Sequence, residues 1–176
     1  TLAVTGAGER TLTRCGIPFQ RIYLHPGHHV GYYPGSRPMD LKLLFAPTDG
    51  RLLGAQAVGW EGVDKRIDVI ATALQAGLTV YDLEEAELCY APQFGAAKDP
   101  VNVAGMIAAN ALRGDAPVCA WSEVGGAFLL DVRDADEFAA GHLEGAVNIP
   151  LHELRARHGE LPRNQPVEVY CQVGQR

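Results

Sequence analysis

Short apolar runs in the first two thirds of the chain predict β-strands, and turn residues separate them. The runs are Leu2–Thr5, Arg21–Leu24, Leu41–Phe45 and Leu52–Val58. The last two are joined through Pro47-Thr48-Asp49-Gly50, which is a strong hairpin signal. A helical turn is expected at Glu9–Arg14, between the first two strands.

Two longer segments carry apolar residues at helical spacing. The first has Gly77 at its C′ position and turns one face inward: Val63, Ile67, Ile70, Ala71 and Leu74. The second begins with Asp99 as N-cap and Pro100 at the first helical position, and it ends at Gly114. Its inward residues are Ala104, Ile107, Ala108, Ala111 and Leu112. The pattern predicts an α+β domain in which helices pack on one side of an antiparallel sheet.

Beyond residue 115 strands and helices alternate. The expected order is strand Phe128–Val132, helix Ala135–Ala140, strand Ala146–Ile149, helix Leu151–His158 and strand Val167–Tyr170. Such alternation predicts an α/β unit with a parallel sheet. The chain is therefore expected to form two domains, residues 1–114 and residues 115–176.

The composition is sufficient for hydrophobic cores and argues against nucleic acids and membranes as partners. Of 176 residues 47% are apolar, and the net charge of −6 argues against a nucleic-acid or membrane-binding surface. No apolar run approaches the roughly 20 residues that span a bilayer. The four cysteines form no Cys-x-x-Cys motif, which favours thiols in a reducing compartment such as the cytoplasm over disulfides or a zinc site. The chain starts without Met, so a fragment of a longer protein is expected.

The last six residues carry the strongest chemical signal. The strand Val167–Tyr170 delivers Cys171 into a loop that contains Gly174 and ends at Arg176. Open α/β folds bind ligands at the carboxyl ends of their strands. Inward-facing amides in such a loop favour a thiolate, and Arg176 adds a positive charge. The alternative is a buried thiol at a strand end, because cysteine is commonly buried.

Residues 115–176 resemble the first part of a rhodanese domain. The matching segments are Leu130–Asp134, Glu137-Phe138, Gly141–Pro150 and the loop at Cys171. The resemblance implies that Cys171 carries a persulfide and passes its outer sulfur to a nucleophile. Asp131 and Arg133 are expected to brace the loop by hydrogen bonds. The helix that the family places after this loop is not in the sequence, so the domain is expected to be incomplete.

Loop length separates sulfur transfer from phosphate hydrolysis. Related phosphatases place five residues between their cysteine and arginine. Here four residues lie between Cys171 and Arg176, which suits a single sulfur atom better than a phosphate.

Residues 1–114 resemble the C-terminal dimerisation domain of pyridine nucleotide–disulfide oxidoreductases, in the branch of coenzyme A-disulfide reductases and NADH oxidases. The matching segments are Thr5–Glu9, His29–Gly35, Val58–Val69, Tyr90–Phe94 and Lys98–Asn102. The resemblance implies a homodimer that uses FAD and NAD(P)H, with coenzyme A as a further ligand. The cofactor domains would precede this region. Gly6-Ala7-Gly8 is no dinucleotide fingerprint, because position 11 is Thr, so this chain alone is expected to hold neither cofactor.

The same resemblance gives two tyrosines a role in the partner subunit's active site. The best matches are Tyr32 and Tyr90, and Tyr33 is the rival of Tyr32. A phenol can donate a hydrogen bond to a sulfur that gains negative charge. The alternative is that all three tyrosines pack at a dimer interface, where tyrosine is frequent.

Two charged or polar clusters have simpler interpretations. The histidines of the segment 25–29 are predicted to lie in a turn rather than to bind a metal, because no acidic or cysteine partner is near in sequence. Asp64-Lys65-Arg66 is predicted to be a solvated first helical turn, with a role in shaping the flavin site as the alternative.

Together these resemblances imply part of an FAD- and NAD(P)H-dependent disulfide or persulfide reductase of the coenzyme A-disulfide or polysulfide class, fused to a sulfurtransferase. Its substrates would be small-molecule thiols, disulfides or persulfides. Two alternatives stay open: a non-catalytic dimerisation and docking fragment, and part of an NADH oxidase.

Overall fold

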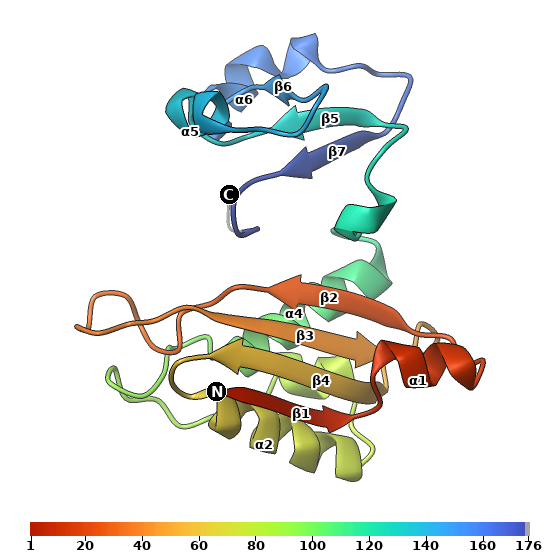
Figure 1. The fold of residues 1–176 in the computed structure, drawn as a ribbon, viewed down its shortest axis with the longest axis vertical. Coiled ribbons are helices and arrows are strands. Elements are labelled where there is room, and N and C mark those ends of the chain that lie inside the picture. The colour runs from red at the N-terminus through yellow and green to blue at the C-terminus, as the bar shows by residue number, and fades with distance from the viewer. Residues whose placement is uncertain (175–176) are drawn as a thin grey trace. The chain divides into compact units, whose positions relative to one another are not determined.

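Contacts divide the chain into two compact units, one spanning Thr1–Val118 and one beginning at Cys119. The structure is a computed structural model that describes residues 1–174. Each unit has its own sheet and its own hydrophobic core. Figure 1 shows the elements of both units, coloured from red at the N-terminus to blue at the C-terminus.

The first unit is built on a four-stranded antiparallel sheet (Figure 1). In spatial order its strands are β1 (Leu2–Gly6), β4 (Leu52–Gly59), β3 (Met39–Phe45) and β2 (Gln20–Leu24). The β3–β4 hairpin closes at Gly50, whose φ of 74° favours glycine. A Cβ at Gly50 would also lie 2.8 Å from Val80 Cγ2. The predicted strands and hairpin are confirmed.

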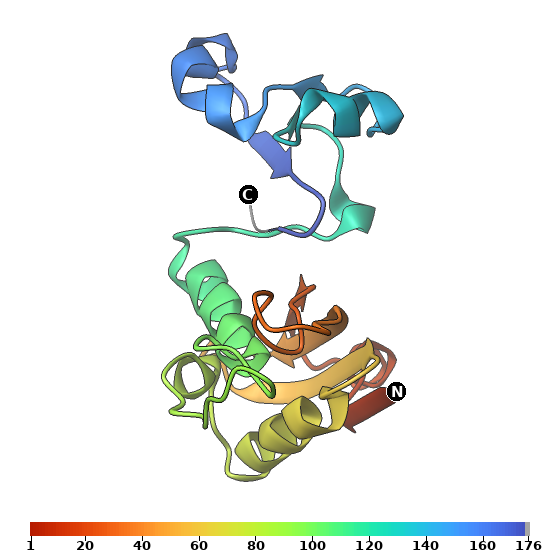
Figure 2. The same ribbon diagram turned by 90° about the vertical axis from the view of Figure 1, so that its left-hand side faces the viewer.

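Helices supply the other side of the first unit's core (Figure 2). They are α2 (Val63–Gln75), α3 (Val80–Glu84) and α4 (Pro100–Arg113), and the predicted turn after β1 is α1 (Glu9–Arg14). Helix α2 packs against β1 and β4, whereas α4 packs against β2 and β3. Alternate residues of β3 point into this core: Leu41, Leu43 and Phe45. This is the predicted α+β arrangement.

Helix α3 is an element that the sequence pattern does not predict. The Asp82 carboxylate accepts a hydrogen bond from the Thr79 amide at 2.7 Å, which caps the first turn. Five residues are too few to form a stable helix in isolation. Close packing on α4 supports α3: a Cβ at Gly105 would lie 2.3 Å from Glu84 N. Tertiary contact, rather than local pattern, therefore establishes this helix.

The other face of the first sheet is partly apolar. Side chains alternate across each strand, so this face carries the residues that do not point into the core. Its exposed apolar members are Leu2, Val4, Tyr23 and Val58. Asp40, Lys42 and Gln56 share the face, as the strand register shows. The face of the sheet opposite the helices is therefore a mixture of apolar and polar side chains.

The second unit has a parallel three-stranded sheet in the order β6-β5-β7. Its elements are β5 (Phe128–Asp131), α5 (Ala135–Ala140), β6 (Val147–Asn148), α6 (Leu151–Arg157) and β7 (Val167–Tyr170), with 3₁₀ turns at Trp121–Glu123 and His158–Glu160. Leu130, Val132 and Ile149 form its core. The predicted α/β alternation is confirmed. Among the helices of residues 1–174, none is both long and apolar enough to cross a membrane.

Candidate functional sites

The cysteine site lies directly after β7. Cys171 is half-buried, and its Sγ accepts a hydrogen bond from the Gly174 amide at 3.1 Å. Gly174 has a φ of 74°, a conformation that turns the loop back toward the sulfur and that glycine adopts without strain. The main chain therefore directs one donor at the sulfur, which favours a thiolate. Arg176, predicted at the rim of this loop, lies outside the described residues.

Asp131 and Arg133 form an ion pair at the carboxyl end of β5. The buried Asp131 carboxylate accepts hydrogen bonds from Arg133 Nη2 at 2.7 Å and from the Arg133 amide at 2.8 Å. Arg133 Nη2 also donates to the Gly141 carbonyl at 2.7 Å. Asp131 stands in register with Tyr170, the residue that precedes Cys171. The pair thus stabilises the edge from which the loop leaves, while its direct bracing of the loop stays a prediction.

The ionisation of Asp131 follows from two opposing effects. Burial of the carboxyl group is the largest effect and raises its pKa, but the hydrogen bonds from Arg133 and from Tyr170 together outweigh burial. The pKa of Asp131 therefore lies below its ordinary value of 3.8. Burial raises the pKa of Tyr170. At neutral pH Asp131 is therefore ionised and the neighbouring Tyr170 is neutral.

The tyrosine site lies on two loops of the first unit, residues 25–38 and residues 85–99. Tyr32 Oη and Tyr90 Oη are 2.7 Å apart, although 58 positions separate the residues in sequence. Both side chains are open to solvent, Tyr32 at 75% and Tyr90 at 48% exposure. The rival Tyr33 instead stacks edge-on against the His29 ring, with centroids 5.6 Å apart. The structure therefore brings together the two tyrosines that the sequence placed first.

The hydrogen bond between the two phenols changes the acidity of one of them. The bond from Tyr32 is the largest cause that raises the pKa of Tyr90 above its ordinary value of 10.0. Of two hydroxyls that share one hydrogen bond, one keeps its own proton available for a third group. The pair can therefore donate one hydrogen bond outward at neutral pH.

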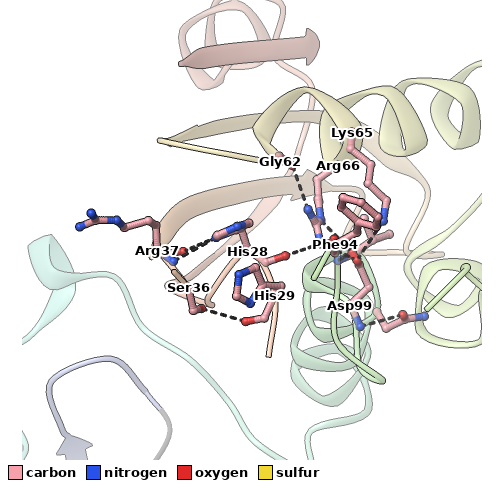
Figure 3. Close-up of polar contacts among 11 residues, drawn as sticks. His28, His29, Ser36, Arg37, Gly62, Lys65, Arg66, Phe94 and Asp99 are labelled. Atoms are coloured by element: carbon pink, nitrogen blue, oxygen red, sulfur yellow. Dashed lines mark hydrogen bonds and ion pairs between the residues drawn. The ribbon is translucent and has the colours of Figure 1, made fainter. Parts of the chain in front are cut away.

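Arg66 is a buried residue that the sequence analysis expected to lie in solvent. Its guanidinium is 1% exposed and pairs with Asp99, with Nη2 2.8 Å from Oδ2 and Nε 3.2 Å from Oδ1 (Figure 3). The prediction of a solvated helical turn is therefore wrong for Arg66. Helical spacing held the signal, because Arg66 follows Val63 by three positions and precedes Ile70 by four, both on the inward face. The inward position was overlooked because a charged residue in a first helical turn usually faces solvent.

Asp99 has a second function at the start of α4. Its Oδ1 accepts a hydrogen bond from Val101 N at 3.1 Å, which is the predicted N-cap contact. Lys65 Nζ lies 3.9 Å from Asp99 Oδ2. One buried carboxylate thus joins the first turn of α2 to the first turn of α4.

Hydrogen bonds engage the histidines of the segment 25–29. The Arg37 amide donates to His28 Nδ1 at 3.0 Å, and His28 Nε2 lies 3.2 Å from Glu61 Oε2. His25 pairs with Asp40 at 2.5 Å. In the part of the chain that the structure describes, no three His, Cys, Asp or Glu side chains are grouped so that they could hold a metal ion.

Gly6, the first glycine of the Gly6-Ala7-Gly8 segment, allows two strands to pack closely. A Cβ at Gly6 would lie 2.4 Å from the Leu53 carbonyl oxygen, so this glycine allows β1 and β4 to approach. The helix that follows Gly8 has six residues, too short to provide a strong N-terminal dipole. The segment therefore lacks both the third glycine and the long following helix of a dinucleotide-binding turn.

Comparison with known proteins assigns both units. Residues 1–100 match the pyridine nucleotide-disulphide oxidoreductase dimerisation domain, and residues 118–176 match the rhodanese-like domain. The coenzyme A disulfide reductase of Staphylococcus haemolyticus is 43% identical over 105 residues, which are 60% of this chain and 23% of that protein. The chain thus spans about a quarter of the length of the curated relatives it matches.

Two solved structures resemble nearly the whole chain. Reduced Bacillus anthracis CoADR-RHD is 43% identical with a TM-score of 0.95, over 99% of this chain and 32% of that one. A NAD-dependent persulfide reductase from A. fulgidus is 34% identical with a TM-score of 0.88, over the same shares. The chain therefore belongs to the pyridine nucleotide-disulphide oxidoreductases through their dimerisation domain, which a rhodanese-like domain follows.

Proposed function

We propose that this chain is part of an FAD- and NAD(P)H-dependent reductase of disulfides or persulfides, and that Cys171 is a sulfur carrier for it. The single observation that supports the carrier most directly is the hydrogen bond from the Gly174 amide to Cys171 Sγ, 3.1 Å long, at the carboxyl end of a parallel strand. Relatives with the names coenzyme A disulfide reductase and persulfide reductase support the reductase class.

The sulfur transfer balances without any external oxidant. The Cys171 thiolate attacks the outer sulfur of a donor such as thiosulfate, a new S–S bond forms, and the donor leaves with the electron pair of its broken bond. An acceptor thiolate then attacks the outer sulfur of the Cys171 persulfide. The acceptor becomes a persulfide, and the Cys171 thiolate returns. Amides around the loop would stabilise the sulfur anion at both stages.

Reduction of the acceptor persulfide consumes two electrons, which NAD(P)H supplies through the flavin when both are bound. We place both cofactors on other domains of the reductase, because Gly6-Ala7-Gly8 is no dinucleotide fingerprint. We place coenzyme A or another small thiol as the acceptor, and the cytoplasm as the compartment that keeps such thiols reduced.

The Tyr32–Tyr90 pair would act on the reductase side, in the active site of the partner subunit of a homodimer. Its outward hydroxyl proton would stabilise the sulfur anion that leaves when a disulfide is cleaved. Support comes from the 2.7 Å distance between the two hydroxyls and from the exposure of both rings, which leaves them accessible to a partner. The match to a dimerisation domain supports the homodimer.

A cyanide–thiosulfate assay on the full-length protein tests the carrier. Cys171→Ala is expected to reduce the release of thiocyanate to the background rate, because no other group would accept the outer sulfur. Cys119→Ala is the matched control, since it removes an exposed thiol from the same unit and should leave the rate unchanged. If Cys171→Ala retains the wild-type rate, Cys171 is not the sulfur carrier.

A further inference from the structure

Arg66 lies outside the proposed chemistry, yet it is one of the most deeply buried side chains of the first unit. We propose that Arg66 is a positioning residue that sets the geometry of the Tyr32–Tyr90 pair by holding together the two loops that carry these tyrosines. This inference rests on the proposed function for the importance of the pair, although the geometry itself can be measured independently.

The guanidinium of Arg66 contacts the main chain of both loops (Figure 3). Nη2 donates to the His28 carbonyl at 2.7 Å and points toward the Phe94 carbonyl at 3.4 Å. Nη1 donates to the Gly62 carbonyl at 3.2 Å. Three backbone segments that are far apart in sequence therefore converge on one side chain.

Both contacts lie close to the tyrosines along the chain. His28 precedes Tyr32 by four positions, and Phe94 follows Tyr90 by four. Next to the contact at Phe94, the Val30 amide donates to the Gly95 carbonyl at 3.1 Å, which joins the two loops directly. Arg66 thus joins the two loops at one end, and the hydrogen bond between Tyr32 and Tyr90 joins them four residues further along each loop.

Burial contributes little to holding the two tyrosines in place, because Tyr32 is 75% exposed and Tyr90 48% exposed. An exposed hydrogen bond between two side chains contributes little by itself. The 2.7 Å contact therefore depends on where the two loops place the rings. Arg66 and the Val30–Gly95 bond provide that placement.

Only arginine can make this set of contacts. Its planar group presents donors in several directions at once, so it binds the Asp99 carboxylate with one edge and still donates to carbonyls on other sides. The ammonium of lysine would keep the charge but would place all donors on one atom. Asp99 compensates the buried charge, so the guanidinium remains available to the loops.

Arg66→Lys in the full-length protein tests the proposal by amide hydrogen exchange. We expect the segments 28–37 and 90–95 to exchange at least about tenfold faster, because their shared anchor is lost, while β3 and β4 exchange at the wild-type rate. Arg113→Lys is the matched control: Arg113 forms a forked ion pair with Glu84, at 2.6 Å and 3.2 Å, and Glu84 lies six positions before the measured segment 90–95. It should leave these segments unchanged.

A second measurement separates positioning from a general structural role. Spectrophotometric titration, as a difference against Tyr90→Phe in the same background, reports the pKa of Tyr90. Arg66→Lys should lower this pKa toward the ordinary value of 10.0, since the bond from Tyr32 is weakened. Gly62→Ala is the second variant in case Arg66→Lys does not fold, because its Cβ would lie 2.3 Å from Arg66 Nη1 and displace the guanidinium.

Unchanged exchange in both loops would overturn the proposal, and so would faster exchange that extends through β3 and β4. If neither variant folds, Arg66 stabilises the whole unit and the proposal is also wrong. If the loops and the pKa respond as expected but Tyr90→Phe leaves disulfide reduction at the wild-type rate, the positioning is supported and the proposed role of the tyrosines fails.

Discussion

Replacement of Asp99 by asparagine should destabilise the first unit strongly although the two side chains have the same shape. Asparagine keeps an oxygen that can accept from Val101 N, so the N-cap of α4 is retained. The substitution removes the negative charge opposite Arg66, which lies 2.8 Å away and is 1% exposed. Lys65, 3.9 Å from the same carboxylate, loses its counter-charge as well.

The general energetics of buried ion pairs set the expected loss of stability. Breaking such a pair by removing one partner costs about 3–5 kcal/mol, because the remaining charge stays buried and uncompensated. We expect about 3 kcal/mol for Asp99→Asn, at the lower end, since the amide oxygen still accepts one hydrogen bond from Arg66. Asp99→Ala should cost about 1 kcal/mol more because it also removes the N-cap.

Urea unfolding monitored by circular dichroism at 222 nm measures these differences, because α2 and α4 supply much of the helical signal. With a slope of about 1–3 kcal/mol per molar urea, a loss of about 3 kcal/mol lowers the midpoint by at least about 1 M. Glu84→Gln is the control, since it breaks the solvent-exposed pair with Arg113 and should cost less than about 1 kcal/mol. The reasoning is refuted if Asp99→Asn costs no more than Glu84→Gln.

Two further predictions concern packing and pH. Gly105→Ala should lower the free energy of unfolding by about 1–3 kcal/mol in the same urea assay, because its Cβ would lie 2.3 Å from Glu84 N. Gly31→Ala is the control and should be nearly neutral, because the space around its Cβ is open. Equal effects of the two variants would contradict the close approach of α3 and α4. Asp131→Asn should destabilise the second unit at pH 7. Its carboxyl pKa is lowered in the folded state, so this contribution is fully present above 3.8 and is lost as the pH falls through the folded value. The difference in Tm between wild type and variant should shrink from pH 7 to pH 2, and a difference that does not depend on pH would contradict the role of the Arg133 pair.

Local chemistry was sufficient to predict most of the secondary structure. Asp99 and Pro100 define the start of α4, and Gly114, with a φ of 79°, defines its end. The strand before Cys171 is an apolar run, and β7 ends where that run ends. Capping and periodicity act within a few residues, so the sequence carries these signals directly.

The tyrosine pair could be predicted only in part. The resemblance to a known family selected Tyr32 and Tyr90, but it offered Tyr33 as a rival. The structure separates them because the ring of Tyr33 packs in a T-shaped arrangement with His29, while Tyr32 reaches Tyr90. No local pattern contains that choice, since it depends on how two loops meet.

The sequence by itself determined the two units, their strands and long helices, and the position of Cys171 at a strand end. The tertiary structure decided that Arg66 is buried, that α3 forms, and that two tyrosines 58 positions apart share a hydrogen bond. The physical reason is the distance along the chain over which each interaction acts. Periodicity and capping involve neighbours along the chain, whereas a buried charge is tolerated only where distant segments supply its counter-charge and its acceptors.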